Sequence, residues 1–286
     1  MADLSNKIAL ITGATAGIGL ETARGIAKTG AKVIVVGRDQ AKGERVVAEL
    51  KASTQNQHIE LLVADLFSLA AIRRLADDFK NKYDRLDILV NNAGAIFDKR
   101  ETTVDGLEKT FALNHISYFL LTNLLLDLIK QSAPARIVSV SSIAQTFANK
   151  VDFDDLQFER KRFSAMGAYA QSKLMNVLFT YELARRLAGA NVTANCLHPG
   201  GVASNFADNT GGIIGAFAWV FKNTFAITPA KGAETSVYLA TSSEVENVTG
   251  KYFDNKREKP SSKISYDADV QKRLWTVSEE IVGQKF

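Results

Sequence analysis

The sequence predicts an α/β fold in which helices cover both faces of a doubly wound parallel sheet. Short apolar runs rich in β-branched residues alternate with longer amphipathic stretches along almost the whole chain. The runs are nearly continuous in apolar residues, as expected when a parallel sheet is buried on both faces. Strict alternation of strand and helix implies right-handed crossovers, and a glycine-rich turn directly follows the first run.

The same pattern gives the order of the elements. The expected strands cover residues 7–12, 32–37, 59–66, 86–94, 136–142, 191–200 and 250–254. Amphipathic periodicity predicts helices at about 17–30, 39–53, 69–83 and 104–131, a helix that contains 164–177, and a last one at about 266–283. No repeat or proline-rich linker divides the chain, so we expect a single domain over residues 1–286. A glycine-rich apolar stretch at about 204–227 interrupts the alternation and is predicted to be a small substrate lid.

The composition is typical of a soluble globular protein. Of 286 residues, 46% are hydrophobic and 23% charged, and a net charge of +4 gives no reason to expect a nucleic acid partner. Cys196 is the only cysteine, so no intrachain disulfide can form, which fits a reducing compartment. The N-terminus has the pattern of neither a signal peptide nor a membrane anchor, and we expect a cytoplasmic protein.

The sequence predicts neither a transmembrane segment nor a metal site. The most membrane-like stretch, residues 211–227, is too short and too interrupted by polar residues to be a transmembrane segment, although peripheral contact with a membrane stays open. The histidines His58, His115 and His198 lack the spacing of metal ligands, so we expect no metal site.

A nucleotide-binding motif follows the first strand. In the turn TGATAGIG, residues 12–19, glycines permit a close approach of backbone N–H groups to a pyrophosphate at the start of a helix. The pattern alone would be a plain loop, but its place between the first strand and the first helix favours a dinucleotide site of the Rossmann type. The residues predicted to contact the cofactor here are Gly13, Thr15, Gly17, Ile18 and Gly19.

The end of the second strand bears on the choice between NADP(H) and NAD(H). An acidic residue there usually binds the adenosine ribose of NAD, whereas in this chain Gly37 is followed by Arg38. A guanidinium can bind a 2′-phosphate through paired, charge-assisted hydrogen bonds, so we expect NADP(H) in preference to NAD(H). The alternative is that Arg38 is solvated and Asp39 selects the cofactor, although Asp39 fits better as the start of the next helix.

The third and fourth strands end in further candidates for cofactor binding. Asp65 and Leu66 are both expected to contact the cofactor. Asp65 could hydrogen-bond the adenine, and capping of the following helix explains it equally well. The small residues of NNAG, with Asn92, Ala93 and Gly94, would let the backbone approach the nicotinamide ribose.

A tyrosine and a lysine lie one helical turn apart in YAQSK, at Tyr169 and Lys173. Alone, such a pair is common on exposed helices. Here TGATAGIG, NNAG, VSVSS and YAQSK occur in the order typical of short-chain dehydrogenases/reductases, and the chain resembles that family from residue 7 to about 254.

The resemblance implies four catalytic residues. Tyr169 would be the acid–base residue, and Lys173 would lower the pKa of its phenol and bind the nicotinamide ribose. Ser142 would hydrogen-bond the substrate oxygen; Ser141 is the alternative, but alternation along a strand prevents both from pointing into one site. Asn114 would hold a water that links Lys173 to solvent.

The same resemblance extends the predicted cofactor site beyond the sixth strand, into the segment LHPGGV. There we expect Pro199, Gly200 and Val202 to lie against the cofactor, together with Tyr169 and Lys173.

The segments VDFDDLQFERKRF and QKRLWTVSEEIVG resemble the branch that contains retinol dehydrogenases and retinal reductases. This implies that NADP(H) drives the interconversion of a lipophilic aldehyde or ketone and its alcohol, with retinal as one candidate. The chain departs from the branch in two ways: no membrane-anchoring segment is evident, and Thr15 or Ala16 replaces the usual asparagine of the glycine turn. Aromatic residues of the predicted lid would line an apolar channel or pack on the body; they are Phe217, Trp219, Phe221 and Phe225.

Two other functions and the assembly stay open at this level. The chain could be a nucleotide-binding regulator without turnover, or a light-dependent pigment reductase of the protochlorophyllide type. The apolar run at residues 119–129 could mediate a homodimer or be buried against the sheet.

Overall fold

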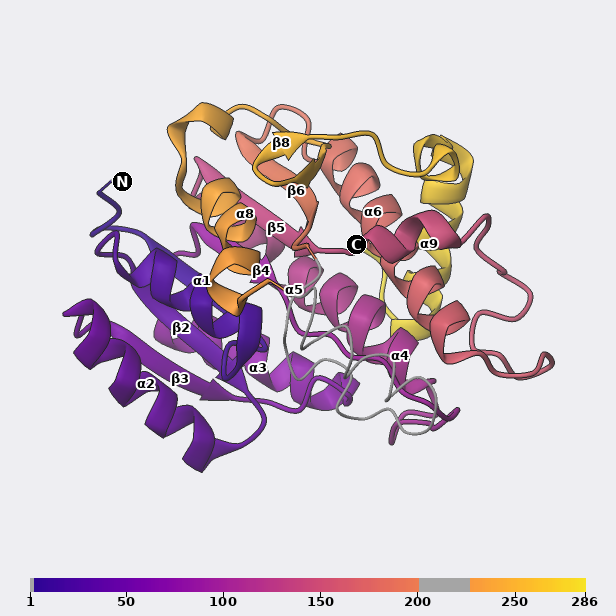
Figure 1. Cartoon of the computed structure of the whole chain (residues 1–286), viewed down its shortest axis with the longest axis horizontal. Helices are drawn as coiled ribbons and strands as arrows, with labels where there is room; N and C mark the ends of the chain where they lie inside the picture. The colour runs from indigo at the N-terminus through magenta and orange to yellow at the C-terminus, as the bar shows by residue number, and fades with distance from the viewer. Residues whose placement is uncertain (1–2, 201–226) are drawn as a thin grey trace.

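One sheet lies between two layers of helices (Figure 1). The structure is a computed structural model that describes residues 3–200 and 227–286. In the order in which they pair, the strands are β3 (Ile59–Val63), β2 (Lys32–Gly37), β1 (Ile8–Thr12), β4 (Ile88–Asn91), β5 (Ala135–Val140), β6 (Val192–His198), β7 (Tyr252–Asp254) and β8 (Arg257–Glu258). Neighbours are parallel except for β7 and β8, which confirms the predicted doubly wound sheet.

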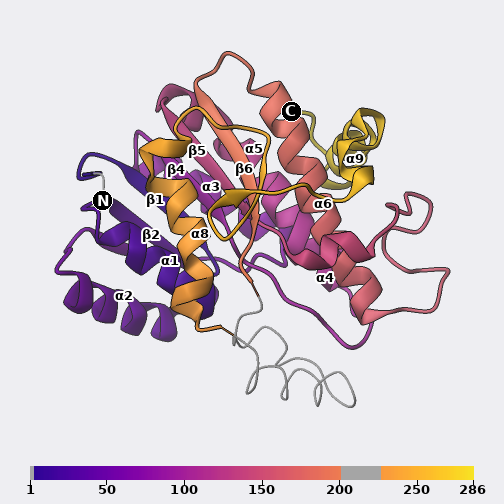
Figure 2. The same ribbon diagram turned by 45° about the horizontal axis from the view of Figure 1, so that its top comes forward.

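Helices cover both faces of the sheet (Figure 2). On one face lie α1 (Gly17–Ala27), α2 (Gln40–Thr54) and α8 (Pro229–Thr241); on the other lie α3 (Leu69–Lys82), α5 (Ser117–Gln131), α6 (Ala165–Arg186) and α9 (Ala268–Val282). Successive residues of a strand point to opposite faces, so Leu10 is buried with Leu121 in one core and Ile11 with Ile26 in the other. The apolar strands are therefore covered on both sides, as their composition indicated.

The helix expected at 104–131 differs from the prediction. Helix begins only at Lys109, with the short α4 (Lys109–Phe111), because Gly106 lies in a turn with a φ of +76°. Glu108 then caps the first turn by accepting hydrogen bonds from two backbone N–H groups. Between α4 and α5 the chain forms a π-helical turn, η1 (Ala112–Ile116), which no periodicity in the sequence had indicated.

The C-terminal helix expected at about 266–283 is confirmed as α9, Ala268–Val282. Helix α8 was not among the predicted elements. The lid expected at 204–227 lies, except for its last residue, outside the described residues, as do its aromatic side chains.

The apolar run at residues 119–129 lies in α5, where Phe119, Leu120 and Leu125 are fully buried. Among the described helices, the segment Lys109–Gln131 is long and apolar enough to cross a membrane, but 78% of its apolar window is buried inside the protein. This degree of burial is that of a core helix, and Leu124, Leu126 and Leu128 of the run are half-buried.

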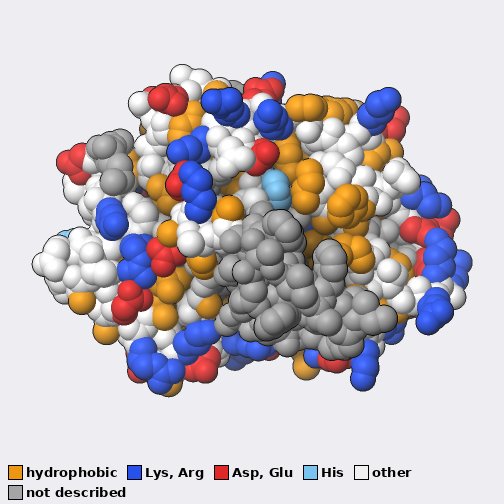
Figure 3. Space-filling model, in the orientation of Figure 1, with side chains coloured by type: hydrophobic (Ala, Val, Ile, Leu, Met, Phe, Trp, Pro, Cys, Tyr) orange, Lys and Arg blue, Asp and Glu red, His pale blue; other side chains and the backbone are white. Residues whose placement is uncertain are grey.

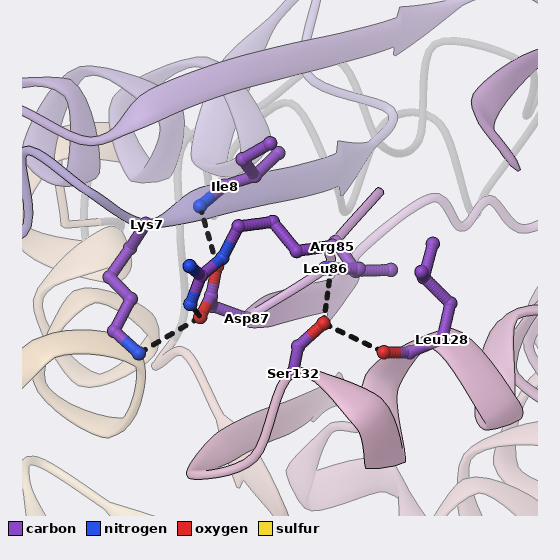
Figure 4. Close-up of polar contacts among 7 residues, drawn as sticks. All are labelled: Lys7, Ile8, Arg85, Leu86, Asp87, Leu128 and Ser132. Atoms are coloured by element: carbon purple, nitrogen blue, oxygen red, sulfur yellow. Dashed lines mark hydrogen bonds and ion pairs between the residues drawn. The ribbon is translucent and has the colours of Figure 1, made fainter. Parts of the chain in front are cut away.

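A polar cluster ties the amino ends of β1 and β4 together (Figure 4). The carboxylate of Asp87 accepts hydrogen bonds from Lys7 Nζ and from the backbone N–H of Ile8, both at 2.9 Å, and from the guanidinium of Arg85. Next to it, the Ser132 hydroxyl links the end of α5 to the start of β4. This cluster fixes the register of the two central strands, whose opposite ends carry the site.

Candidate active site

The glycine turn lies at the carboxyl edge of the sheet, where the chain order reverses between β1 and β4. Gly13 and Gly17 have φ values of +64° and +56°, which glycine alone adopts readily. A Cβ on Gly13 would lie 2.8 Å from the Cα of Ala93, and one on Gly19 would lie 2.3 Å from the carbonyl oxygen of Gly13. The turn therefore passes too close to the end of β4 for a side chain at either position.

Helix α1 begins with free backbone donors. Its N-cap is Ala16, which makes no side-chain capping bond, and Ile18 lies in its first turn. Helix α5 also has no side-chain cap, but it continues directly from η1. The long helices α2, α3, α6, α8 and α9 begin at side chains that accept backbone N–H groups, namely Asp39, Ser68, Ser164, Thr228 and Asp267. The donors at the start of α1 suit an anion such as a pyrophosphate.

The residues after β2 and β3 lie on the same edge. Arg38 is exposed, whereas the carboxylate of Asp39 caps α2 by accepting a backbone N–H at 2.9 Å. Asp65 is exposed and accepts the backbone N–H of Phe67 at 3.1 Å. It does not cap α3, because that helix begins at Ser68; its carboxylate instead closes a local turn, and the adenine contact stays a prediction. Leu66, also predicted to contact the cofactor, is buried in the core.

Thr12, which the sequence analysis did not single out, holds the end of β4 onto the glycine turn. Its hydroxyl accepts the backbone N–H groups of Asn92 at 2.9 Å and Ala93 at 3.1 Å. The Asn92 amide in turn donates to the Thr12 carbonyl oxygen at 2.9 Å. The threonine that opens TGATAGIG was the available signal, since its hydroxyl can accept both N–H groups while it donates to the carbonyl oxygen of Val90.

Tyr169 projects from α6 toward the residue that follows β5. Its phenol hydrogen-bonds Ser142, whose hydroxyl also accepts the backbone N–H of Ala144 at 3.2 Å. Ser141 is engaged elsewhere, because its hydroxyl donates to the carbonyl oxygen of Lys173 at 2.7 Å. The structure thus places Ser142, and not Ser141, beside the tyrosine.

Burial dominates the proton affinities of Tyr169 and Lys173. Burial raises the pKa of Tyr169 to about 12, and the hydrogen bond with Ser142 lowers it only in part. Burial lowers the pKa of Lys173 to about 7. The lysine Nζ donates to the carbonyl oxygen of Val140 at 3.0 Å and lies 5.7 Å from the centre of the tyrosine ring. The pKa of the phenol is therefore raised and not lowered as we expected, because desolvation outweighs the hydrogen bond with Ser142.

Asn114 lies in η1 with its amide fully engaged. Its Oδ1 accepts the backbone N–H of Ala95 at 2.9 Å, and its Nδ2 donates to the carbonyl oxygen of the same residue and to the hydroxyl of Ser172. A Cβ on Gly94 would lie 3.2 Å from Asn114 Oδ1 and 3.3 Å from Lys173 Nζ. The predicted asparagine, lysine and glycine therefore meet at one point, with Ser172 as a supporting residue that the sequence analysis missed.

The loop after β6 closes this edge of the site. Pro199 and Gly200 follow the strand, and Gly200 has a φ of +85°. The ring of His198 accepts the backbone N–H of Ile143 through Nδ1 at 3.2 Å and so braces the loop that follows Ser142. Val202, also predicted to contact the cofactor, lies outside the described residues.

These residues fit a nicotinamide dinucleotide. The uncapped start of α1 and the side-chain-free turn at Gly13 suit the pyrophosphate, and the space that a Cβ on Gly94 would fill borders Lys173. Arg38 offers a cation at the adenosine end. In residues 3–200 and 227–286, no group of three or more His, Cys, Asp or Glu side chains could hold a metal ion.

Comparisons with known proteins agree with this geometry. The family model described as short chain dehydrogenase matches residues 7–153. Retinol dehydrogenase 13 of Mus musculus is 43% identical over 291 residues, which cover 99% of this chain and 85% of that protein. The crystal structure of an uncharacterized protein from Mycobacterium Paratuberculosis is similar with a TM-score of 0.79 and 32% identity, over 100% of this chain and 97% of that one. A short chain dehydrogenase from Escherichia coli complexed with NADPH gives a TM-score of 0.70 and 27% identity, over 89% of this chain and 98% of that one.

Proposed function

This chain belongs to the short-chain dehydrogenase family, in the branch of the retinol dehydrogenases, and we propose that it is an NADP(H)-dependent oxidoreductase that interconverts a lipophilic aldehyde or ketone and its alcohol. The observation that carries the proposal is the hydrogen bond between Tyr169 and Ser142 next to a buried Lys173. At the edge of the sheet where the glycine turn lies, Tyr169 can donate a proton to the carbonyl oxygen of a substrate, and Ser142 can donate a hydrogen bond to that oxygen. Lys173 adds a cation next to them.

The mechanism assigns each side chain a step. The bound nicotinamide supplies the hydride in reduction and takes it up in oxidation. Tyr169 gives its phenolic proton to the carbonyl oxygen of the substrate, which Ser142 holds by a hydrogen bond. Positively charged Lys173 stabilises the phenolate that remains. Asn114 is fixed by its hydrogen bonds to Ala95 and Ser172. In this position it would hold a water that links Lys173 to solvent, so that the proton given up by Tyr169 can be replaced.

The preference for NADP(H) rests on the two residues after β2. The carboxylate of Asp39 caps α2 through Oδ1, and this bond turns the side chain toward the helix instead of toward a ribose hydroxyl. Gly37 lies against the glycine turn, because a Cβ there would be 2.5 Å from the methyl group of Thr15. Arg38 is the next residue and is exposed. A guanidinium in this place favours the 2′-phosphate of NADP(H). The similar dehydrogenase from Escherichia coli is complexed with NADPH.

An apolar surface next to the catalytic pair supports a lipophilic substrate. The short helix η2 (Ile143–Phe147) follows Ser142 and packs against α6. Ile143, Phe147 and Met166 are 49%, 65% and 46% exposed, although large apolar side chains in this fold are otherwise mostly buried. In the orientation of Figure 1, Figure 3 shows hydrophobic side chains gathered near the centre and right of the visible face of the molecule. Retinal is a candidate because a retinol dehydrogenase is 43% identical to this chain.

The test is NADPH oxidation by the purified protein across lipophilic aldehydes and ketones, retinal included. We expect turnover with NADPH, much less with NADH, and none in Tyr169→Phe, which retains NADPH binding. Arg38→Ala should raise the KM for NADPH and leave that for NADH unchanged. Binding of NADPH without turnover on any substrate would instead favour a regulator, and turnover only under illumination would favour a pigment reductase.

A further inference from the structure

The buried histidine next to Asn114 has no part in the reaction described so far. His115 is completely buried in η1, and its Nε2 lies 2.9 Å from the hydroxyl oxygen of Ser278 in α9. Its ring stacks on Phe111, with ring centres 5.7 Å apart, and meets Phe179 edge to face at 6.3 Å. A polar ring in an aromatic cluster is costly unless its one hydrogen bond is made.

The hydrogen bonds determine which nitrogen of His115 carries the proton. Ser278 donates its hydroxyl hydrogen to the carbonyl oxygen of Leu274 at 2.7 Å. Its oxygen therefore accepts from His115, so Nε2 is protonated and Nδ1 is not. Nδ1 has no hydrogen-bond partner among the described residues. Burial lowers the pKa of His115 to about 3, so the ring is neutral at any pH at which the protein would be assayed.

The π-helical turn is held from two sides by neighbouring residues. Asn114 binds the loop after β4 through Ala95 and binds α6 through Ser172. His115 binds α9 through Ser278. The turn departs from the regular α-helical register, and these three contacts tie its side chains to the loop after β4, to α6 and to α9.

Helix α9 is itself rigidly docked, so it can serve as the anchor. The ring of Trp275 is stacked on Phe179, with ring centres 5.9 Å apart, and the guanidinium of Arg186 lies 4.1 Å from the centre of the indole. The indole also meets Phe119 of α5 edge to face, with ring centres 5.0 Å apart.

We propose that His115 is a positioning residue: its hydrogen bond to Ser278 couples α9 to the π-helical turn and holds Asn114 in place against Lys173. This rests on the proposed reductase function. His115 touches neither substrate nor cofactor in this account, and it acts through the orientation of Asn114.

The decisive variant is the double substitution His115→Phe with Ser278→Ala. It keeps the aromatic stacking and leaves no buried donor or acceptor unpaired, so its melting temperature should stay near that of the wild type. The link to α9 is nevertheless gone. We expect kcat to fall about tenfold at an unchanged KM for NADPH, since small displacements of catalytic groups cost one to two orders of magnitude in rate. His115→Gln, which keeps a donor, should recover part of kcat.

The matched control is Gln271→Met, also in α9. Gln271 is buried and hydrogen-bonds Ser265 and Arg185, but it does not contact η1. This variant should lose stability and keep kcat. A wild-type kcat in the double variant would overturn the proposal, because the link would then not affect the reaction. An equal loss of kcat in Gln271→Met would also overturn it, because kcat would then follow the stability of α9.

A second readout does not need turnover. Backbone hydrogen exchange at residues 112–116 should accelerate in the double variant while exchange at 268–282 stays unchanged. If the wild type reduces no carbonyl compound, the proposed function fails, and the exchange measurement still decides whether the link holds the turn. Unchanged exchange at 112–116 would refute the link.

Discussion

At the scale of single residues, burial sets the proton chemistry of the site. Desolvation raises the pKa of Tyr169 to about 12 and lowers that of Lys173 to about 7. A phenol with a raised pKa keeps its proton at neutral pH and gives it up only if the phenolate is stabilised as it forms. In the proposed mechanism, Ser142 supplies a hydrogen bond for this, and Lys173 supplies a charge as long as it is protonated.

The rate of carbonyl reduction should therefore fall as pH rises through about 7, the pKa of Lys173. Lys173 has a lowered pKa, so its ammonium is present below this value and lost above it, while Tyr169 stays protonated throughout. The measurement is kcat/KM for the carbonyl substrate against pH, because this quantity reports the groups of the free enzyme.

Lys173→Arg provides the control for the pH profile. A guanidinium stays charged across the whole range, so the descending limb near neutral pH should disappear even if the overall rate is lower. A limb that persists in this variant would belong to another group and would contradict the assignment.

At the scale of elements, the site is built from strand ends that press against one another. The turn after β1 lies against the end of β4, and the bonds from Thr12 to Asn92 and Ala93 hold the two together. This close contact leaves no room for a side chain in the turn, so glycine occupies position 13, where the two segments meet. The catalytic groups of α6 and η1 are then placed relative to this edge.

Gly13→Ala should distort the nucleotide site. The new Cβ would lie 2.8 Å from the Cα of Ala93, and a φ of +64° is strained for alanine. We expect a loss of about 1–3 kcal/mol of stability and a weaker affinity for NADPH. Thermal unfolding and fluorescence titration with NADPH measure the two effects.

Gly106→Ala separates backbone strain from crowding. Gly106 also has a positive φ, +76°, but nothing lies within 4 Å of the place that its Cβ would take. This variant should lose less stability and bind NADPH normally. Equal effects in both variants would mean that strain alone, without the contact at Ala93, limits position 13.

At the scale of the whole molecule, the two edges of the sheet have different tasks. The carboxyl edge carries the site, and the amino edge carries the cluster around Asp87 that joins β1 to β4 (Figure 4). Burial alone would raise the pKa of Asp87, but hydrogen bonds from Arg85, the backbone of Ile8 and Lys7 lower it below its ordinary value.

Asp87→Asn should therefore destabilise the fold by about 1–3 kcal/mol at neutral pH, the usual worth of a hydrogen bond to a charged group. Because the pKa of Asp87 is lowered in the folded state, its contribution is complete above the unfolded pKa and disappears as pH falls through the folded pKa. The difference between variant and wild type in chemical denaturation should shrink toward acid pH. Asp77→Asn, at an exposed ion pair with Lys80, should change little at any pH.

The sequence by itself determined the architecture and most members of the site. Apolar strands alternating with amphipathic helices predict a doubly wound sheet because local periodicity and burial on both faces are linked. The glycine turn, NNAG and the Tyr169–Lys173 pair are local patterns whose positions follow from that architecture. Even α8 had a local signal, since Thr228 and Pro229 form a typical helix start that the analysis did not use.

Only the tertiary structure decided what depends on distant contacts. The part of Thr12, the bond that engages Ser141 with Lys173, and the contacts that hold Asn114 in the π-helical turn arise between segments far apart in the chain. The pKa values of Tyr169 and Lys173 are set by desolvation, which sequence spacing does not report; spacing alone suggested that the lysine would lower the phenol pKa. Likewise, His115 gains its partner from α9, because residues 163 positions apart meet only when the two helices pack on the same face of the sheet.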